Sequence, residues 1–335
     1  MTLPRQAIVP LLAILAGGCS GWQSALDPQG PQANHLARLI WGFTILCAII
    51  WVLVMVALGI ALWRRIEPPV DPLAQDPIAE RRFTGVVGVL VAATALIVLT
   101  LTGWSYYSQK RIYSPEDPQL TIQITGQQWW WAVRYEDPQP DQTFTTANEI
   151  HIPVDVPVKL KLKSSDVIHS FWVPSLAGKQ DLIPGQDNEL HLKASRPGVY
   201  RGQCAEFCGL QHAHMSLLVI AEPQEDFERW RQSQVASADE PDDDEIRRGR
   251  DAFLSKPCVM CHAIQGTQAG GRVAPDLTHV GSRRYIGAGV LPLSRGNLAA
   301  WIVDPHGIKP GVNMPTIKLE PDDVNAIAAY LEGLK

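Results

Sequence analysis

Two long runs without a charged residue dominate the first third of the chain. They extend from Leu39 to Trp63 and from Phe83 to Gln109. As a helix the first run would be about 37 Å long, enough to cross a hydrocarbon core of about 30 Å. A soluble helix of that length would keep a polar face, and neither run has one. The pattern therefore predicts a transmembrane helical hairpin over 36–110, with spans at about 39–63 and 84–107.

The loop between these runs carries arginines directly at both helix ends. Arg64 and Arg65 follow the first span, and Arg81 and Arg82 precede the second. Loops rich in Lys and Arg stay in the cytoplasm. We therefore expect a multi-pass protein of the bacterial inner membrane, with everything after about residue 110 on the periplasmic side.

Residues 1–19 have the features of a signal peptide. Arg5 precedes a short apolar stretch from Ala7 to Ala16, which is followed by Gly17, Gly18 and Cys19. Such a segment is removed from the mature protein. Its end resembles a lipoprotein box, in which Cys19 would carry a lipid. Cleavage at another small residue is the alternative, and it would make Cys19 incidental.

Beyond residue 112 the apolar period changes to two. The residues at 120, 122 and 124 are apolar, as are those at 158, 160 and 162, with polar residues between them. This alternation is typical of half-buried strands. Turn residues recur, for example at Pro184 and Gly185, and no helical pattern interrupts the strands up to about Glu222. We expect an all-β sandwich or barrel over 112–230.

The last loop of this β domain holds four soft metal ligands, Cys204, Cys208, His212 and Met215. Such ligands select copper over magnesium or calcium, with zinc as the nearest rival. Two cysteines in one loop indicate two copper ions bridged by two sulfurs. A second loop must then supply another imidazole, and His169 is the obvious donor. A disulfide or a structural zinc site is the alternative for the two cysteines.

A second outer domain follows a charged segment. Residues 231–245 include a stretch rich in Asp and Glu without an apolar period, which predicts an acidic linker. Beyond it, Cys258, Cys261 and His262 form the C-x-x-C-H signature of covalently attached haem c. The thiols bind the haem and the histidine ligates its iron.

The sixth haem ligand is expected to be a thioether. Met314 is the only methionine after the attachment signature, and it precedes a predicted helix that begins near Pro321. His279 and His306 are possible rivals, although Pro and Gly around them are typical of loops. About 90 residues, over 246–335, leave room for three or four short helices around one haem, as in class I cytochromes c, which this segment resembles.

Charge and composition narrow the functional classes. The net charge is -5 and the pI is about 6.0. A nucleic-acid-binding domain would instead show clustered Lys and Arg. Charged residues make up 19% of the chain, below the roughly 25% usual for soluble domains, in agreement with a membrane segment.

Taken together, the motifs resemble the cytochrome c oxidase subunit II family. The shared segments are Gly126–Trp131, Asp166–Pro174, Ile183–Gly185, Ser195–Gly198 and Cys204–Met215. The resemblance implies a helical hairpin, a cupredoxin barrel and a dinuclear copper centre called CuA. Its ligands would be His169, Cys204, the backbone carbonyl of Glu206, Cys208, His212 and Met215.

The resemblance also implies roles for residues around the copper. The Glu206 side chain would face a magnesium ion shared with subunit I. Trp129 would be the exposed tryptophan at which electrons enter, although an aromatic run is equally typical of barrel packing. His214 stays open as a ligand in place of His212. Glu80 either matches an acidic residue at the mouth of a proton path or is a solvated surface group.

The function implied is electron acceptance for a proton-translocating oxidase. Electrons from cytochrome c or another periplasmic donor would pass through haem c and CuA to subunit I, where oxygen is reduced to water, with subunit III as a further partner. A CuA subunit of a nitric oxide reductase is the alternative. A copper-delivery or thiol-redox protein would need neither the haem nor the Glu206 loop. Quinol-oxidase relatives share the fold but lack the copper ligands.

Overall fold

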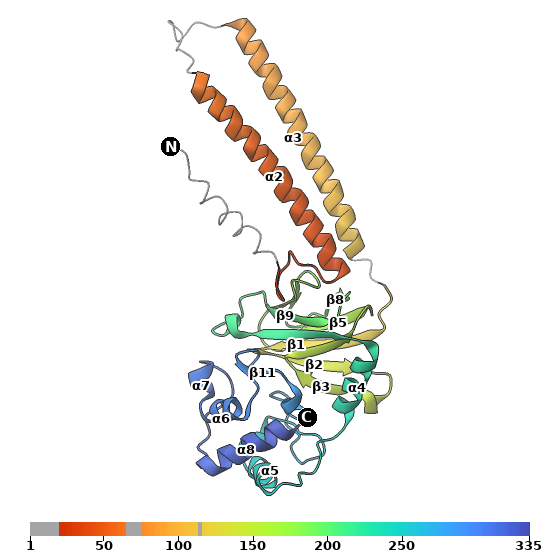
Figure 1. Ribbon diagram of the computed structural model, residues 1–335, viewed down its shortest axis with the longest axis vertical. Helices are drawn as coiled ribbons and strands as arrows, with labels where there is room; N and C mark the ends of the chain where they lie inside the picture. The colour runs from red at the N-terminus through yellow and green to blue at the C-terminus, as the bar shows by residue number, and fades with distance from the viewer. Residues whose placement is uncertain (1–19, 65–75, 113–115) are drawn as a thin grey trace, which may run out of the picture. The chain divides into compact units, whose positions relative to one another are not determined.

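The computed structural model describes residues 20–64, 76–112 and 116–335 of the chain (Figure 1). The predicted signal peptide, with Cys19, lies outside the described residues, as does Arg65. The chain divides into two compact units, one formed by His35–Pro115 and the other by Met1–Asn34 together with Glu116–Lys335.

Two long helices form the first of these units. Helix α2 spans Pro31–Arg64 and helix α3 spans Pro77–Ile112. Asp76 caps α3, because its Oδ1 accepts hydrogen bonds from the backbone N–H groups of Ile78 and Ala79 at 2.9 and 3.2 Å. Both helices are long and apolar enough to cross a membrane, and their most apolar windows are 0% buried. They extend beyond the predicted spans into the polar flanking residues.

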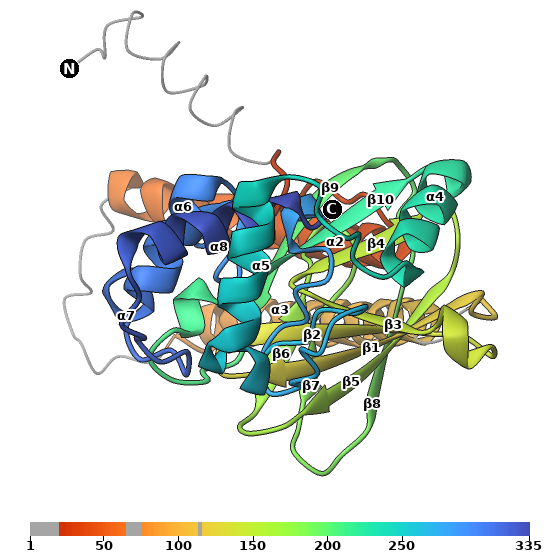
Figure 2. The same cartoon turned by 90° about the horizontal axis from the view of Figure 1, so that it is seen from below.

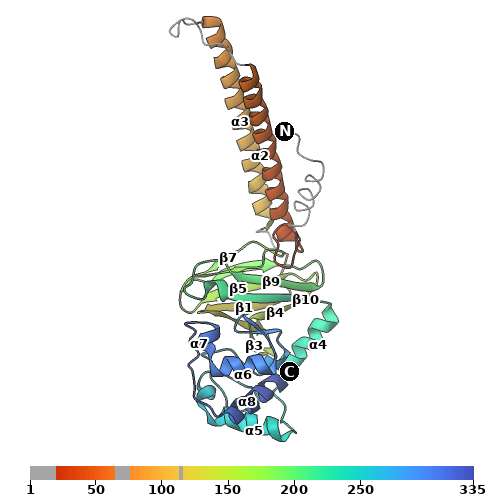
Figure 3. The same ribbon diagram turned by 60° about the vertical axis from the view of Figure 1, so that its left-hand side comes forward.

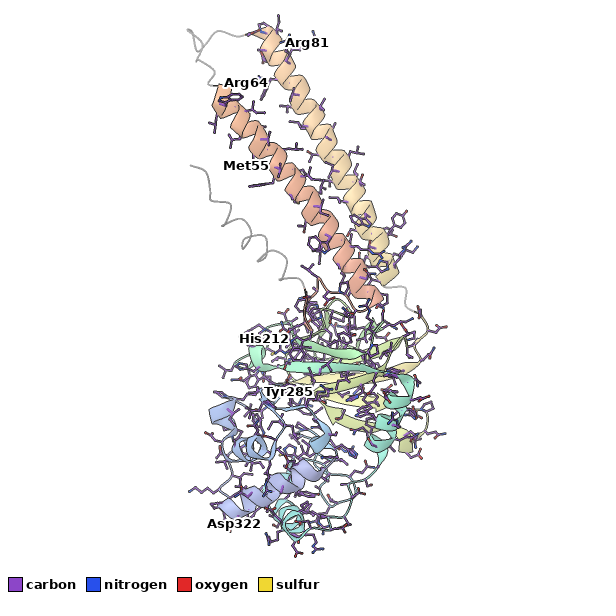
Figure 4. All side chains as sticks on the ribbon, viewed as in Figure 1. Met55, Arg64, Arg81, His212, Tyr285 and Asp322 are labelled. Atoms are coloured by element: carbon purple, nitrogen blue, oxygen red, sulfur yellow. The ribbon has the colours of Figure 1, made fainter. Side chains whose placement is uncertain are left out.

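The two helices run side by side, as Figures 1 and 3 both show. Gly42 of α2 faces the ring of Trp104 on α3 so closely that a Cβ atom would collide with it. The absence of a side chain at Gly42 therefore allows the close approach. Figure 4 shows Arg64 and Arg81 at the same end of the pair.

The β domain consists of two five-stranded sheets. Their strand orders are β3-β2-β1-β5-β8 and β4-β10-β9-β6-β7. The strands are β1 (Leu120–Gln127), β2 (Trp130–Glu136), β3 (Phe144–Ala147), β4 (Glu149–Pro153), β5 (Val158–Ser164), β6 (His169–Trp172), β7 (Gln180–Leu182), β8 (Asn188–Leu192), β9 (Gly198–Cys204) and β10 (Ser216–Glu222). This cupredoxin-like sandwich confirms the predicted fold class.

The predicted alternation places the core between the sheets. Ile122, Ile124, Leu160 and Leu162 are all 0% exposed. The lysines between the apolar residues of β5 point outward, and Lys159 pairs with Glu189 of β8. Alternate residues of a strand face opposite sides of the sheet, so β5 contributes one face to the core and one to the solvent.

The predicted acidic linker over 231–245 is shorter in the structure. Helix α4 (Gln224–Val235) continues past the predicted start of the linker. Helix α5 (Asp244–Ser255) begins before the predicted end of the linker. Asp243 caps α5 by accepting hydrogen bonds from the N–H groups of Glu245 and Ile246 at 2.7 and 3.1 Å. Acidic residues stabilise a helix N-terminus, so part of the charged stretch starts a helix rather than linking domains.

The C-terminal domain is helical (Figure 2). Its elements are α5, the 3-10 turns η3 (Pro257–Met260) and η4 (Val280–Ser282), the short strands β11 (Tyr285–Ile286) and β12 (Leu291–Pro292), and the helices α6 (Arg295–Val303), α7 (Pro305–Ile308) and α8 (Pro321–Gly333). Helices α5 and α8 cross closely because Gly249 has no Cβ to collide with the carbonyl of Ala326. The helical domain was predicted, whereas the β11–β12 hairpin was not.

The helical domain also packs against the β sandwich within the second unit. The Glu149 carboxylate accepts hydrogen bonds from the N–H groups of Arg284 and Tyr285 at 2.6 and 3.3 Å. The Ser216 hydroxyl donates to the carbonyl of Ala288 at 2.8 Å. Tyr285, labelled in Figure 4, therefore lies where the two domains meet.

Candidate functional site

The strand order of the second sheet assembles the predicted copper ligands. Strand β9 ends at Cys204 and strand β6 begins at His169, and the two strands are neighbours. The loop that follows β9 carries Cys208, the turn η2 (His212–His214) and then Met215, directly before β10. Ligands far apart in the chain therefore meet at one end of the sandwich.

The two cysteine sulfurs form the centre of this cluster. The Sγ atoms of Cys204 and Cys208 lie 3.7 Å apart, and both thiols are free. A disulfide would require about 2.05 Å, so this alternative is not formed here. The Nδ1 atom of His169 lies 3.9 Å from Cys204 Sγ, and the Nδ1 atom of His212 lies 3.8 Å from Cys208 Sγ.

The two remaining donors complete the set. The Met215 Sδ atom lies 3.9 Å from Cys208 Sγ, and the Glu206 carbonyl oxygen lies 3.2 Å from Cys204 Sγ. The structure thus brings together all six residues predicted as copper ligands. Each cysteine sulfur has its own imidazole. A single tetrahedral zinc ion would take only four donors, fewer than the six residues gathered here. These soft sulfur and imidazole donors fit copper.

The two thiols share their protons unequally. The hydrogen bond with Cys208, together with that from His169, lowers the pKa of Cys204 to about 3, although burial opposes the shift. The same pairing and burial raise the pKa of Cys208. A thiolate is the form that binds a metal, so metal binding would release the remaining thiol proton.

Two residues position His169. Its Nε2 atom lies 2.8 Å from Asp166 Oδ1, which leaves Nδ1 facing the sulfur. Burial lowers the pKa of His169, but the hydrogen bonds with Cys204 and Asp166 outweigh it and the pKa is raised. Gly126 lies against the ring, where a Cβ would sit 2.8 Å from His169 Cδ2. Asp166 and Gly126 both belong to the motifs shared with the family, but the sequence alone did not predict that they position His169.

The structure distinguishes the two histidines of the loop over residues 205–215, which we call the copper loop. His214 is exposed, and its Nδ1 atom lies 2.8 Å from Gln211 Oε1. His212, by contrast, faces Cys208. In the described part of the chain the one group of three His, Cys or acidic ligands is His169 with Cys204 and Cys208. The magnesium expected at Glu206 therefore rests on the family resemblance alone.

Trp129 is not exposed, contrary to the expectation from the resemblance. Its side chain is 8% exposed, and its Nε1–H donates to the carbonyl of Cys208 at 3.0 Å. The loop of the helical domain covers it, because a Cβ at Gly311 would lie 3.8 Å from the indole ring. The neighbouring Trp131 is 0% exposed and belongs to the core. Trp129 is in contact with the copper loop but shielded from other proteins.

The haem-attachment segment forms a tight turn. The N–H groups of Cys261 and His262 both donate to the carbonyl of Cys258, at 3.2 and 3.0 Å. The Nδ1 atom of His262 donates to the carbonyl of Pro275 at 2.7 Å, which leaves Nε2 free to bind iron. Burial lowers the pKa of His262, and a neutral imidazole is the form that binds a metal.

The surrounding residues also fit a haem group. Met314 is half buried in the irregular segment between α7 and α8. Both ring nitrogens of its rival His279 are 3.0 Å from backbone carbonyls, and the other rival, His306, is exposed. Arg283 is buried, and among the described residues its Nε–H has no hydrogen-bond partner. Its guanidinium group donates to the carbonyl of Asp276, so only the Nε–H is left for an acceptor on a bound group such as a haem.

Comparison with known families agrees with this geometry. Residues 120–222 match the family model described as cytochrome c oxidase subunit II, periplasmic domain, and residues 246–335 match that described as cytochrome c. The chain is 34% identical to cytochrome c oxidase subunit 2 of Alkalihalophilus pseudofirmus, over 100% of this chain and 98% of that protein.

Two further relatives are informative. Cytochrome c oxidase subunit 2 of Bacillus subtilis is 30% identical, over 98% of this chain and 96% of its own. Quinol oxidase subunit 2 of Bacillus cereus is 30% identical over 67% of this chain and 77% of its own. The matches to cytochrome c oxidase subunits span both domains from end to end, and the chain belongs to the cytochrome c oxidase subunit II family, whose members are parts of haem-copper oxidase complexes.

Proposed function

We propose that this chain is the electron-accepting subunit of a respiratory cytochrome c oxidase. A periplasmic donor, cytochrome c or a similar protein, reduces the helical domain. The electron then passes to the copper domain and on to subunit I, where oxygen is reduced to water. The observation that supports this order most directly is the 2.7 Å hydrogen bond from Gln211 Nε2, in the copper loop, to the carbonyl of Pro310, in the Met314 segment.

The residues named above would hold both cofactors. Cys258, Cys261, His262 and Met314 would hold haem c, and the six donors around Cys204 and Cys208 would hold the CuA pair. When bound, these groups supply one-electron carriers, and an electron shared between two copper ions spreads the change in charge. Each sulfur keeps its own imidazole, and β6, β9 and β10 fix those donors on a rigid sandwich. Ligands fixed in this way need little rearrangement when the charge changes.

Membrane anchoring follows from the two apolar helices and the family. The arginines at one end of the hairpin, Arg64 and Arg81, support a cytoplasmic loop and two periplasmic domains. Subunit I would be the direct partner, with a magnesium ion at Glu206 shared between the two subunits. Subunit III remains an expected neighbour. Cleavage after residues 1–19 and a proton path that begins at Glu80 remain predictions.

A quinol oxidase is the competing function, because the Bacillus cereus relative carries that name. The complete set of copper donors favours cytochrome c over quinol as the electron source. Residues 246–335 favour it further, because a cytochrome domain provides a surface for a protein donor.

The substrate test compares the two donors directly. The complex, purified through a tag on this chain, is expected to consume oxygen when supplied with reduced cytochrome c and to be inactive with a quinol. An oxygen electrode measures both rates on one preparation. Oxygen uptake that is faster with the quinol, or consumption of nitric oxide without oxygen uptake, would contradict the proposal.

A further inference from the structure

Lys309 is the most unusual residue at the junction of the two domains. It is 2% exposed, and its Nζ atom donates to three backbone carbonyls, those of Trp129, His214 and Gly287, each at 2.8 Å. Within the described residues, no carboxylate lies at ion-pair distance from it. A buried ammonium group is costly unless every N–H finds an acceptor, and here three acceptors match its three donors.

The three carbonyls belong to three different segments. Trp129 lies in the turn between β1 and β2, and His214 lies in the copper loop, so two acceptors belong to the β domain. Gly287 lies in the β11–β12 turn of the helical domain. Lys309 itself lies between α7 and Met314, in the segment that carries the expected axial ligand. One side chain therefore ties that segment to the copper loop.

Neighbouring contacts also hold the segment around Lys309 against the β domain. Asn313 Nδ2 donates to the carbonyl of Gln128 at 3.1 Å, and Gln211 Nε2 donates to that of Pro310 at 2.7 Å. Gly311 has a φ of +83°, and a Cβ there would lie 3.0 Å from Leu210 Cδ1. The segment thus adopts a backbone conformation that favours glycine at the residue that covers Trp129. Residues 309–313 are shaped to lie on the copper domain.

From this geometry we infer that Lys309 is a positioning residue, which holds the haem-binding domain permanently against the copper loop and so fixes the path between the two centres. This inference rests on the proposed function and deepens it. Because the same segment covers Trp129, an external donor cannot reach that tryptophan and must reduce the helical domain first.

The test uses the full chain in detergent, loaded with haem and copper. Haem c is reduced by a light pulse, and the rate of electron transfer to copper is followed by absorbance in Lys309→Met, Lys309→Gln and wild type. The experiment is run near pH 6, where a lysine side chain is an ammonium ion with all three N–H donors. Lys318→Met is the matched control, because Lys318 is an exposed lysine in the same connecting segment.

Charge-assisted hydrogen bonds to three carbonyls are lost in Lys309→Met, so the docked population and the transfer rate are expected to fall by about tenfold or more. Lys309→Gln keeps an amide donor, so its transfer rate is expected to lie between the rates of Lys309→Met and wild type. If Lys309→Met does not fold, Lys309→Gln decides the question by itself. Hydrogen exchange of the peptides around Trp129 should become faster in the variants but not in Lys318→Met.

Two outcomes would overturn the inference. One is an unchanged transfer rate in both Lys309 variants. The other is a slower rate accompanied by loss of the haem potential or of the sulfur-ligation band, because Lys309 would then act through Met314 rather than through docking. If the wild-type chain itself passes no electron from haem to copper, the proposed function fails instead. The two failures are therefore distinguishable.

Discussion

Cys208→Ser is expected to abolish the copper pair while leaving the haem in place. Cys208 lies at the centre of the donor set, because its sulfur is within 4 Å of the donor atoms of Cys204, His212 and Met215. A hydroxyl oxygen is a harder donor and cannot bridge two copper ions as a thiolate does. Copper should fall from about two ions per chain to at most one. Turnover with cytochrome c should fall by more than the roughly 10–100-fold typical of changes to outer-shell partners.

Metal analysis, electron spin resonance and oxygen uptake measure this effect on one preparation. Cys47→Ser is the matched control, because Cys47 is an exposed cysteine of helix α2 outside the donor set. The control should keep its copper and its activity. A Cys208→Ser protein that retains two copper ions and a spin signal shared by two nuclei would show that Cys208 is not a bridging ligand.

Met314→His is expected to keep the haem attached but to lower its reduction potential. Attachment depends on Cys258, Cys261 and His262, which are unchanged. A thioether favours reduced iron, so its replacement by an imidazole should lower the potential by on the order of 100 mV. Reduction by a high-potential donor then becomes unfavourable, and oxygen uptake on that donor slows. Redox titration and the ferric band that reports sulfur ligation measure the change.

His306→Ala serves as the control for Met314→His, because His306 is exposed on α7. It should leave the potential and the sulfur band unchanged. If Met314→His keeps both the band and the parental potential, Met314 is not the axial ligand. The sixth ligand would then come from elsewhere, since His279 already has both ring nitrogens beside carbonyls.

Local patterns predicted most of the fold. The uncharged runs gave the hairpin, and the alternation at Ile122, Ile124, Leu160 and Leu162 gave strands with one buried face, as found. The ends of elements were less accurate because they depend on caps. Asp243 looked like part of a charged linker, yet its carboxylate caps α5. A sequence pattern shows the charge but not the backbone N–H groups that the charge meets.

Long-range contacts account for what sequence reasoning missed at the site. The copper donors lie mostly in one loop, so their convergence could be predicted from spacing and family resemblance. Lys309 could not, because its three carbonyl partners belong to segments up to 180 residues away. The burial of Trp129 has the same cause, since residues of the helical domain cover it. A single sequence gives no sign that two separate domains will share a buried side chain.

The order of reduction in the full chain tests the central claim most directly. The chain, loaded with haem and copper and fully oxidised, is mixed rapidly with excess reduced cytochrome c, and both absorbance bands are followed. The haem c band is expected to change first, at a rate proportional to the donor concentration. The copper band should follow at a rate independent of that concentration. The copper band could instead change as fast as the haem band, at a rate proportional to the donor concentration. That result would show direct reduction of the copper domain and contradict the proposed path.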